Sequence, residues 1–417
     1  MQQLSPTRRV LALVALALGG FGIGTTEFAS MGLLPLIGDD LVPGFAANPE
    51  RGIQTAGWLI SAYALGVVVG APAIAVLAAR MSQRRLVVIL VAAFTVANLS
   101  SALMPTFELT LLSRFVSGIP HGAYFGVASL LAARIMGPGR QGAGVALALS
   151  GLTIANVIGV PLGTWLGQMA GWRWSYVAIA GVFALTLLLG LRTLPNVPGD
   201  PTRNPLSELS ALRSGRLWLM LAVGAIGFGG FFAIYSYIAE TVTRVAGLDE
   251  GVVPWVLATL GIGMTIGNVV GGIAGDRALI PTMLGGFVAV IPVMALYAVL
   301  GGEPIALFVL AFLLGLTTST LVPSIQTRII HIAGDAQLLG AAMNHAAFNV
   351  GNSLGAAVGG AVIGAGLGYL APGWVGVLLA TAGMGLAVVS VLLDRRSASI
   401  RRLETHEQRA LVEPLAR

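Results

Sequence analysis

Apolar residues form twelve long runs along this chain, and short charged or proline- and glycine-rich segments separate them. An α-helix needs about 20 such residues to cross the hydrocarbon core of a bilayer. The pattern therefore predicts an all-α membrane protein with twelve transmembrane helices. We place these spans near residues 10–35, 55–79, 86–104, 109–133, 141–168, 173–194, 217–241, 252–275, 279–300, 304–328, 338–365 and 371–393.

The predicted spans divide into two sets of six. The longest polar interval, 195–216, lies between the sixth and seventh spans and contains four prolines. Asn156-Val-Ile-Gly in span five matches Asn352-Ser-Leu-Gly in span eleven at an offset of 196 residues. Duplicated halves of this kind are common in membrane carriers, which bind their ligands between the halves. We predict two pseudo-symmetric six-helix bundles at 1–194 and 217–394, joined by a cytoplasmic linker at 195–216 and followed by a cytoplasmic tail at 395–417.

Composition supports a membrane protein and excludes several other classes. The 417 residues are 56% hydrophobic and only 10% charged, with a mean hydropathy of +0.89, whereas soluble domains are about 25% charged. All 23 basic residues are arginines. They are not gathered with aromatic residues in a polar domain, so the net charge of +6 predicts no nucleic-acid partner. The absence of cysteine excludes disulfides, thiolate metal sites and cysteine nucleophiles.

The distribution of arginines predicts the orientation. Nineteen of the 23 lie at the termini or in connections that an even number of spans places on the same side as the termini. Three lie in loops on the other side, and Arg114 lies within a span. Cytoplasmic loops of membrane proteins carry an excess of arginine and lysine. We therefore predict a multi-pass protein of the cell membrane with both termini in the cytoplasm.

Glu27 is the first candidate for a functional residue. It is the only charged residue in the 26-residue run from Val10 to Pro35. A carboxylate inside a span costs about 2.5–3.5 kcal/mol on insertion scales, and such residues usually face a cavity and a partner. Arg114 of span four is predicted to lie at a similar depth. A carboxylate whose distance from an arginine changes between two states can carry a proton, and a static structural pair is the alternative.

His121 lies two helical turns from Arg114 on the same predicted face. Histidine titrates near neutral pH, so His121 is predicted either to relay protons or to bind substrate. The alternative is a neutral histidine that bonds to a neighbouring helix. Glu27, Arg114 and His121 are thus the candidates for proton coupling.

Further polar and aromatic residues are predicted to line a cavity between the halves. His345 and Asn349 share one face of span eleven, and aromatic residues recur on one face of span seven. Helix packing is the alternative for all of them, and we assign Asn156 and Asn352 mainly to packing because small residues flank both. The predicted cavity residues are Tyr63, Phe125, Asn156, Phe228, Phe232, Tyr235, Thr317, His345 and Asn349.

The chain resembles the major facilitator superfamily, in its twelve-span drug and sugar efflux branch. The first span, from Gly20 to Pro35, is similar to that of chloramphenicol-resistance and arabinose or sugar-efflux permeases. Arg114-Phe-Val-Ser-Gly118 resembles the Arg-x-x-x-Gly motif of span four. Gly159-Val-Pro-Leu-Gly163 resembles the antiporter motif of span five, with a valine inserted before the proline. The resemblance implies the major facilitator fold, with spans one, four, seven and ten around a central cavity.

The loop motif of this superfamily is only partly present. After span two, Arg80 replaces the expected aspartate, and Arg84 and Arg85 match the final arginine pair. After span eight, Asp276 and Arg277 match the first part of the motif. The resemblance therefore implies a conformational gate at Arg84, Arg85, Asp276 and Arg277.

These features predict a secondary active transporter that exports a small organic molecule, such as an amphenicol, a sugar or a nucleoside-like metabolite, in exchange for protons. The chain has no lysine and hence no phosphate-binding Gly-x-x-x-x-Gly-Lys-[Ser/Thr] loop, so ATP is not expected to drive transport. A facilitative carrier or importer of the same fold is one alternative. A membrane-embedded enzyme is another, although the spans offer few acid–base groups. We expect a monomer in the lipid bilayer, with no catalytic residue, cofactor or metal.

Overall fold

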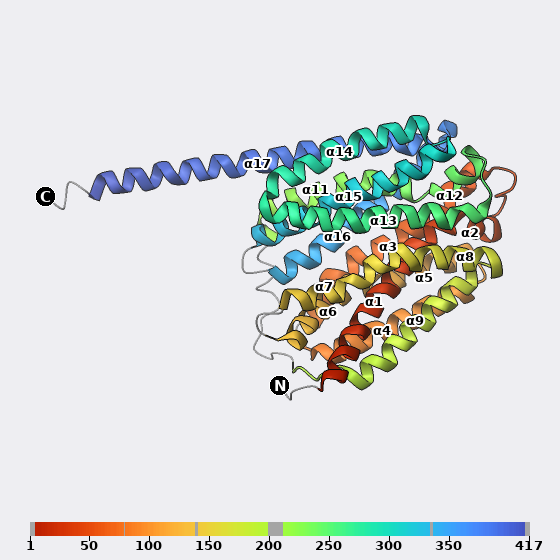
Figure 1. Cartoon of the computed structure of the whole chain (residues 1–417), viewed down its shortest axis with the longest axis horizontal. Helices are drawn as coiled ribbons and strands as arrows, with labels where there is room; N and C mark the ends of the chain where they lie inside the picture. Colours follow the sequence, from red (N-terminus) through yellow and green to blue (C-terminus); the bar gives the residue numbers. More distant parts are fainter. Residues whose placement is uncertain (1–4, 79, 138–140, 199–211, 334–336, 413–417) are drawn as a thin grey trace.

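A computed structural model describes residues 5–78, 80–137, 141–198, 212–333 and 337–412. Within these residues, twelve helical segments are long and apolar enough to cross a membrane. The predicted all-α class and the predicted number of spans are therefore confirmed. The helices pack side by side, and both ends of the chain lie at the same end of the bundle (Figure 1).

The first six spans are built from ten helical elements. Several helices begin at a serine or threonine whose hydroxyl accepts a backbone N–H bond, as Ser5 does from Arg8 and Thr106 from Leu109. The elements are α1 (Pro6–Gly32), α2 (Leu34–Leu41), α3 (Pro49–Leu77), α4 (Gln83–Leu103), α5 (Phe107–Gly118), α6 (His121–Met136), α7 (Gln141–Ile154), the π-helix η1 (Ala155–Gly159), α8 (Val160–Ala170) and α9 (Trp172–Thr193).

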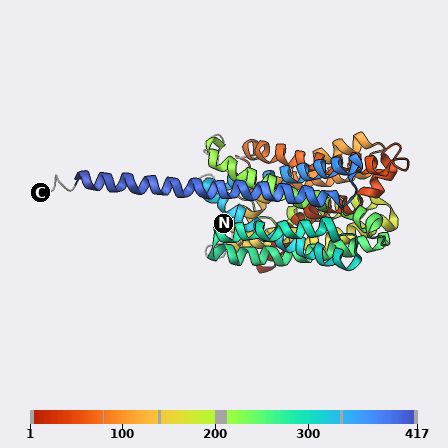
Figure 2. The same ribbon diagram turned by 90° about the horizontal axis from the view of Figure 1, so that it is seen from above.

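The last six spans follow the same plan. Their elements are α11 (Gly215–Tyr235), α12 (Ile238–Glu240), the π-helix η3 (Thr241–Val245), the 3₁₀-helix η4 (Glu250–Val252), α13 (Val253–Arg277), α14 (Leu279–Leu300), α15 (Pro304–Ala333), α16 (Gln337–Val362), the π-helix η5 (Ile363–Leu367) and α17 (Ala371–Val412). The last helix continues past residue 394, where we predicted the bundle to end, and extends beyond it (Figures 1 and 2).

Spans four, five and seven contain irregular turns. Span four breaks between Gly118 and His121, where Pro120 lacks the N–H that a continuous helix would use. Span five widens into the π-turn η1 just before Pro161. Span seven breaks after Tyr235 and ends in the π-helix η3. These irregular turns lie next to the candidate site described below.

The two halves meet along two pairs of spans. Helix α3 of the first half packs on α16 of the second, and α13 of the second half packs on η1 and α8 of the first. Glycines permit this close approach: a Cβ at Gly261 of α13 would lie 2.2 Å from the carbonyl oxygen of Asn156 in η1. The far end is our name for the end of the bundle opposite the termini, formed by residues 42–48, 246–252, 301–303 and 368–370. The end with the termini is the near end.

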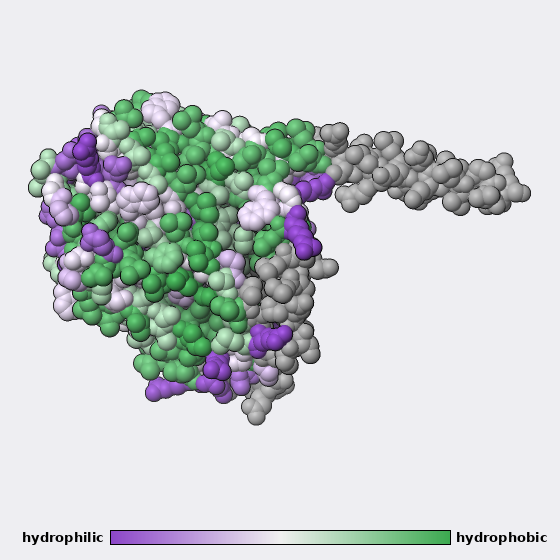
Figure 3. Space-filling view, turned by 180° about the vertical axis from the view of Figure 1, so that it is seen from behind, coloured by the Kyte–Doolittle hydropathy of each residue, from purple (hydrophilic) through white to green (hydrophobic). Residues whose placement is uncertain are grey.

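The outer surface of the bundle is apolar between two polar ends. Figure 3 shows a broad hydrophobic face with hydrophilic residues gathered at its ends. Large side chains such as Leu162, Ile305 and Leu378 are more than half exposed on this surface. At the near end, arginines bond to carbonyl oxygens at the last turns of helices, as Arg8 does to Thr193 and Arg84 to Leu191. The predicted linker lies mostly outside the described residues, but Val197 is buried in the first half.

Candidate functional site

Glu27 lies inside the protein, between the two halves. Its side chain projects from α1 and is only 5% exposed. The Nδ2 atom of Asn352, on α16 of the second half, donates a hydrogen bond of 3.2 Å to Glu27 Oε1. The sequence analysis assigned Asn352 mainly to helix packing. In the structure its amide donates a hydrogen bond to Glu27, the first candidate for a functional residue.

Arg114 lies beside Glu27 but is bonded to a different residue. Its guanidinium donates to the hydroxyl of Thr26 at 3.0 Å and to the carbonyl oxygen of Thr26 at 2.9 Å. The rings of Tyr63 and Tyr176 lie 4.6 Å and 5.2 Å from its central carbon, as in cation–π contacts. Among the described residues, no nitrogen of Arg114 lies within 4.0 Å of a Glu27 oxygen. The structure therefore places the two charges on neighbouring groups without pairing them directly.

His121 begins α6, directly after the break in span four. Its Nδ1 atom lies 3.0 Å from the hydroxyl of Tyr63 and 3.8 Å from Glu27 Oε2. The Nδ1 atom of a neutral histidine either donates or accepts, and its partner decides which. The Nδ1 atom of His121 is therefore bonded to Tyr63 and lies just beyond hydrogen-bond distance of Glu27.

Two predicted cavity residues extend the site towards the near end. The ring of His345, from the second half, lies 6.2 Å from that of His121 and stacks on Phe125 at 5.1 Å. Phe125 in turn contacts His121 at 5.3 Å. The sequence placed these residues on spans four and eleven, and the structure brings them together across the boundary between the halves.

An aromatic cluster from α11 packs on the other side of Glu27. Phe232 stacks on Phe28, the residue after Glu27, with ring centroids 6.3 Å apart, and Tyr235 lies 5.6 Å from the same ring. Phe228 contacts Phe348 at 4.6 Å. Three predicted aromatic residues of span seven thus form one surface next to the carboxyl group. Phe28 itself was missed, because a phenylalanine in an apolar span gives no distinctive signal.

Other predicted residues are not brought into contact with Glu27. The side chains of Asn156 and Asn349 donate to carbonyl oxygens of their own helices, at Leu152 and His345. Thr317 likewise bonds to Leu313 of its own helix. Each of these bonds joins a residue to one four positions earlier, which is the ordinary arrangement for polar groups on an apolar helix. A cavity role for these three residues stays a prediction.

The predicted gate residues lie at the near end of the bundle. The side chain of Arg84 is half-buried and donates a hydrogen bond of 2.5 Å to the carbonyl oxygen of Leu191. Arg85 is exposed in the first turn of α4, and Asp276 and Arg277 are exposed in the last turn of α13. Their position suits a gate at that end, and the gating role itself stays a prediction.

A second buried acid, Glu240, was missed altogether. It is 1% exposed and forms an ion pair with Arg244 one turn later in η3. Residue 240 lies inside the predicted seventh span, so the same argument that selected Glu27 applied to it. Its position one residue from the end of that predicted span made it look like an interfacial charge. Among the described residues, no group of three or more histidines or acids could hold a metal ion.

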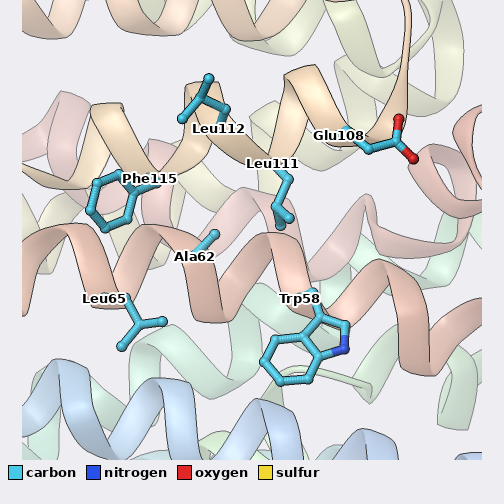
Figure 4. A pocket seen from close by; sticks show the side chains of 7 residues that line it. All are labelled: Trp58, Ala62, Leu65, Glu108, Leu111, Leu112 and Phe115. Atoms are coloured by element: carbon cyan, nitrogen blue, oxygen red, sulfur yellow. The ribbon is translucent and has the colours of Figure 1, made fainter.

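Two apolar grooves lie on the outer surface, away from Glu27. One, of about 310 Å³, runs between α3 and α5 and is lined by Trp58, Leu65 and Leu112, with Glu108 at one end (Figure 4). The other, of about 510 Å³, lies between α1 and α7. The side chains of Trp58, Leu65 and Leu112 are 44–59% exposed, as expected for a surface in contact with lipid.

Comparison with known proteins gives consistent matches along the whole chain. The family model described as Major Facilitator Superfamily matches residues 16–249 and 232–416. Over 384 residues the chain is 37% identical to the inner membrane transport protein YdhP of Escherichia coli strain K12, covering 92% of this chain and 96% of that one. It is 33% identical over 388 residues to the chloramphenicol resistance protein of Streptomyces lividans, covering 89% and 94%.

A solved structure supports the same fold. The nucleoside transporter NupG superposes with a TM-score of 0.66 at 15% identity, covering 92% of this chain and 99% of that one.

Proposed function

Because the chain belongs to the major facilitator superfamily, we propose that it is a proton-coupled antiporter that exports a small organic molecule from the cell by alternating access. The relatives and the fold are those of transporters, so the membrane-enzyme alternative is set aside. We further propose that it works as a monomer in the cell membrane, with the near end and both termini in the cytoplasm.

The observation that carries this proposal is the position of Glu27. A carboxyl group that is 5% exposed and bonded to the opposite half is at the place where an alternating-access movement changes its surroundings. Arg114 already has its hydrogen bonds with Thr26, which leaves the carboxyl group without a fixed ionic partner. Such a group is free to bind and release a proton as its environment changes.

His121 offers a route for the proton towards the near end. Its Nδ1 atom is 3.8 Å from Glu27 Oε2, and its ring faces that of His345. In the proposed cycle, Glu27 takes up a proton from outside and releases it to the cytoplasm through His121. The substrate then binds from the cytoplasm and leaves on the outside.

The aromatic surface of α11 supports a substrate with a flat apolar part. Phe232 and Tyr235 contact Phe28, the residue after the proposed proton carrier, and Phe228 contacts Phe232. An aromatic ring or a nucleobase could stack there, while its polar groups contact the histidines and Tyr63. The chloramphenicol resistance protein of Streptomyces lividans makes an amphenicol the first substrate to test.

The decisive experiment uses Glu27→Gln, which keeps the size and hydrogen bonding of the side chain and removes the titratable proton. Purified protein is placed in vesicles with an acidic lumen, and uptake of labelled chloramphenicol, arabinose and uridine is measured. The wild type should accumulate at least one of them, and a protonophore should abolish the accumulation. The Gln variant should bind that compound but bring it only to the equilibrium ratio.

Glu108→Gln is the matched control, since it makes the same chemical change at an exposed carboxylate away from Glu27. Its accumulation should equal that of the wild type. Undiminished uphill accumulation by Glu27→Gln would refute Glu27 as the proton carrier. Wild-type transport that ignores the protonophore and never exceeds equilibrium would instead identify a facilitative carrier of the same fold.

A further inference from the structure

The bond between Glu27 and Asn352 joins the two halves directly. We propose that Asn352 closes the far end on Glu27 when that carboxyl group carries a proton. Asn352 would then be a positioning residue that makes closure depend on proton loading. This inference rests on the proposed function, in which Glu27 is the proton carrier.

The polar atoms of this pair are not all satisfied. Glu27 is 5% exposed and Asn352 is fully buried. Asn352 Nδ2 donates to Glu27 Oε1 at 3.2 Å. The other polar atom of the amide, Asn352 Oδ1, is buried and has no hydrogen-bond partner among the described residues. A buried acceptor without a donor is unfavourable, so a donor that arrives at this place stabilises the closed arrangement.

Protonation of Glu27 supplies that donor. A carboxylate can only accept hydrogen bonds, whereas a protonated carboxyl group both donates and accepts. A primary amide also has one donating and one accepting end. The protonated Glu27 can therefore exchange two hydrogen bonds with Asn352, and the ionised form only one. Protonation also removes the cost of enclosing a charge between the halves.

The contacts that surround this pair explain why the far end would respond. Ser353 is the next residue on α16, and its carbonyl oxygen accepts a bond of 3.2 Å from Ser61 of α3. About three turns further towards the far end, a Cβ at Gly364 would lie 2.0 Å from Oε1 of Gln54. At the far end itself, Gln168 donates to the carbonyl oxygen of Glu250 at 2.7 Å. These contacts cross between the halves, and the described far end is closed.

Four other ionisable groups face Glu27, and their own contacts leave Asn352 as the partner that senses its proton. Arg114 is bonded to Thr26, and Tyr63 is bonded to His121. His121 belongs to the same half as Glu27, so its contact does not hold the halves together. From the second half, Asn352 is the described residue that hydrogen-bonds to Glu27. The four groups are Arg114, Tyr63, His121 and Tyr235, and the ring of His345 lies against that of His121.

This arrangement would enforce exchange. After substrate leaves on the outside, the carrier closes its far end readily only once Glu27 has taken up a proton. Release of the proton to the cytoplasm weakens the contact with Asn352, and the far end can reopen with substrate. Without this contact, protonation of Glu27 would no longer favour closure of the far end, and export would lose its coupling to the proton.

Spin labels at the far end can measure this closure directly. The chain has no cysteine, so A47C and E303C, both exposed and on opposite halves, give a clean label pair. The distance between the two labels is measured by double electron–electron resonance at acidic and at alkaline pH, without substrate. In the wild type, acidification should increase the ratio of short to long distances by roughly twofold to tenfold, as expected for one additional net hydrogen bond.

Two variants should remove this pH response in opposite ways. Asn352→Leu should show the longer distance at both pH values. Glu27→Gln should keep the high, acid-like ratio of short to long distances at both pH values, because the amide of Gln can exchange two hydrogen bonds with Asn352 as the protonated carboxyl group does. Asn344→Leu is the matched control, since Asn344 is a buried asparagine of the same helix that does not bond to Glu27. It should respond like the wild type.

A wild-type pH response in Asn352→Leu, or opening of the wild-type far end on acidification, would overturn the inference. An increase in the longer distances of Glu27→Gln at alkaline pH would also overturn the inference. This second variant keeps the test valid if Asn352→Leu does not fold. If the distance measurements contradict the role of Asn352 but Glu27→Gln loses uphill transport, the proposed function remains intact. Uphill transport by Glu27→Gln would refute that function instead.

Discussion

At the scale of single residues, the fully buried Arg114 has no acidic group within 4.0 Å among the described residues. The hydroxyl and carbonyl oxygens of Thr26 and the faces of two tyrosines take the place of water around it. The planar guanidinium reaches both oxygens of Thr26 at once, and the ammonium of lysine cannot reproduce that fork. Arg114 thus attaches α5 to α1 one residue away from Glu27.

We expect Arg114→Lys to lower the free energy of unfolding by about 1.5–3 kcal/mol, the usual range for hydrogen bonds to a charged group. Thr26→Val should be destabilising too, and the double variant should lose less than the sum, because both changes break one contact. Chemical denaturation in detergent measures the three values. Thr95→Val, which removes a hydroxyl bonded to its own helix, is the control. Additive losses would show that Arg114 and Thr26 act independently.

The residues of the site differ in how well the sequence reveals them. Glu27 and Arg114 were found because a charge in an apolar span is too costly to be incidental. Thr26 and Asn352 were not, because a neutral polar group in a helix usually bonds to its own backbone or to a neighbouring helix. Only the three-dimensional arrangement shows that their polar atoms meet the two charged groups.

At the scale of elements, α2 is attached to the start of α9 by a charged contact at the far end. Asp40 accepts hydrogen bonds from Trp172 Nε1 at 3.0 Å and from Arg173, with which it also forms an ion pair. Partial burial raises the pKa of Asp40, but the bonds from Arg173 and Trp172 outweigh it and hold the pKa below its ordinary value of 3.8. A carboxylate near a helix N-terminus is also favourable.

The lowered pKa of Asp40 gives a pH dependence with a defined sign. Its stabilising contribution is present above the ordinary pKa of 3.8 and is lost as the pH falls through the lower value of the folded state. Asp40→Asn should therefore lower the melting temperature slightly at neutral pH, and the difference from the wild type should disappear in strong acid. Because Asp40 and Arg173 are both more than a third exposed, the effect should stay within about 1 kcal/mol.

Thermal unfolding at several pH values measures this difference. The control is Asp39→Asn, a change at the exposed neighbouring acid. A difference between Asp40→Asn and the wild type that is constant across the whole pH range would contradict the assignment.

The sequence predicted where the elements lie better than it predicted their internal shape. Runs of apolar residues mark the spans because lipid requires them. The breaks at residues 119–120 and 236–237 and the π-turn at 155–159 depend on how freed backbone groups find partners in the bundle. Pro120 signalled the first of these. The hydrophobic pattern contains no signal for the turn after Tyr235, where no proline occurs.

At the scale of the whole molecule, the distribution of arginines gives the bundle a direction, and exposed tryptophans mark its interfaces with the membrane. Arginines gather at the near end, where several bond to carbonyl oxygens of helix ends. Five of the six exposed tryptophans lie towards the other end, in α3, α8 and the first turns of α9, α13 and α17, and the sixth, Trp218, lies in the first turn of α11 at the near end. Tryptophan prefers the membrane interface, and arginine-rich ends remain in the cytoplasm.

These features predict that the near end faces the cytoplasm. Single cysteines in this cysteine-free chain test it, and two exposed alanines are suited to replacement: Ala47 at the far end and Ala278 between α13 and α14 at the near end. In intact cells a membrane-impermeant maleimide should label A47C and leave A278C unmodified until the cells are permeabilised. Labelling of A278C from outside would show that the protein has the opposite orientation. The proposed direction of transport would then be wrong, because proton uptake at Glu27 and substrate release would face the wrong compartments.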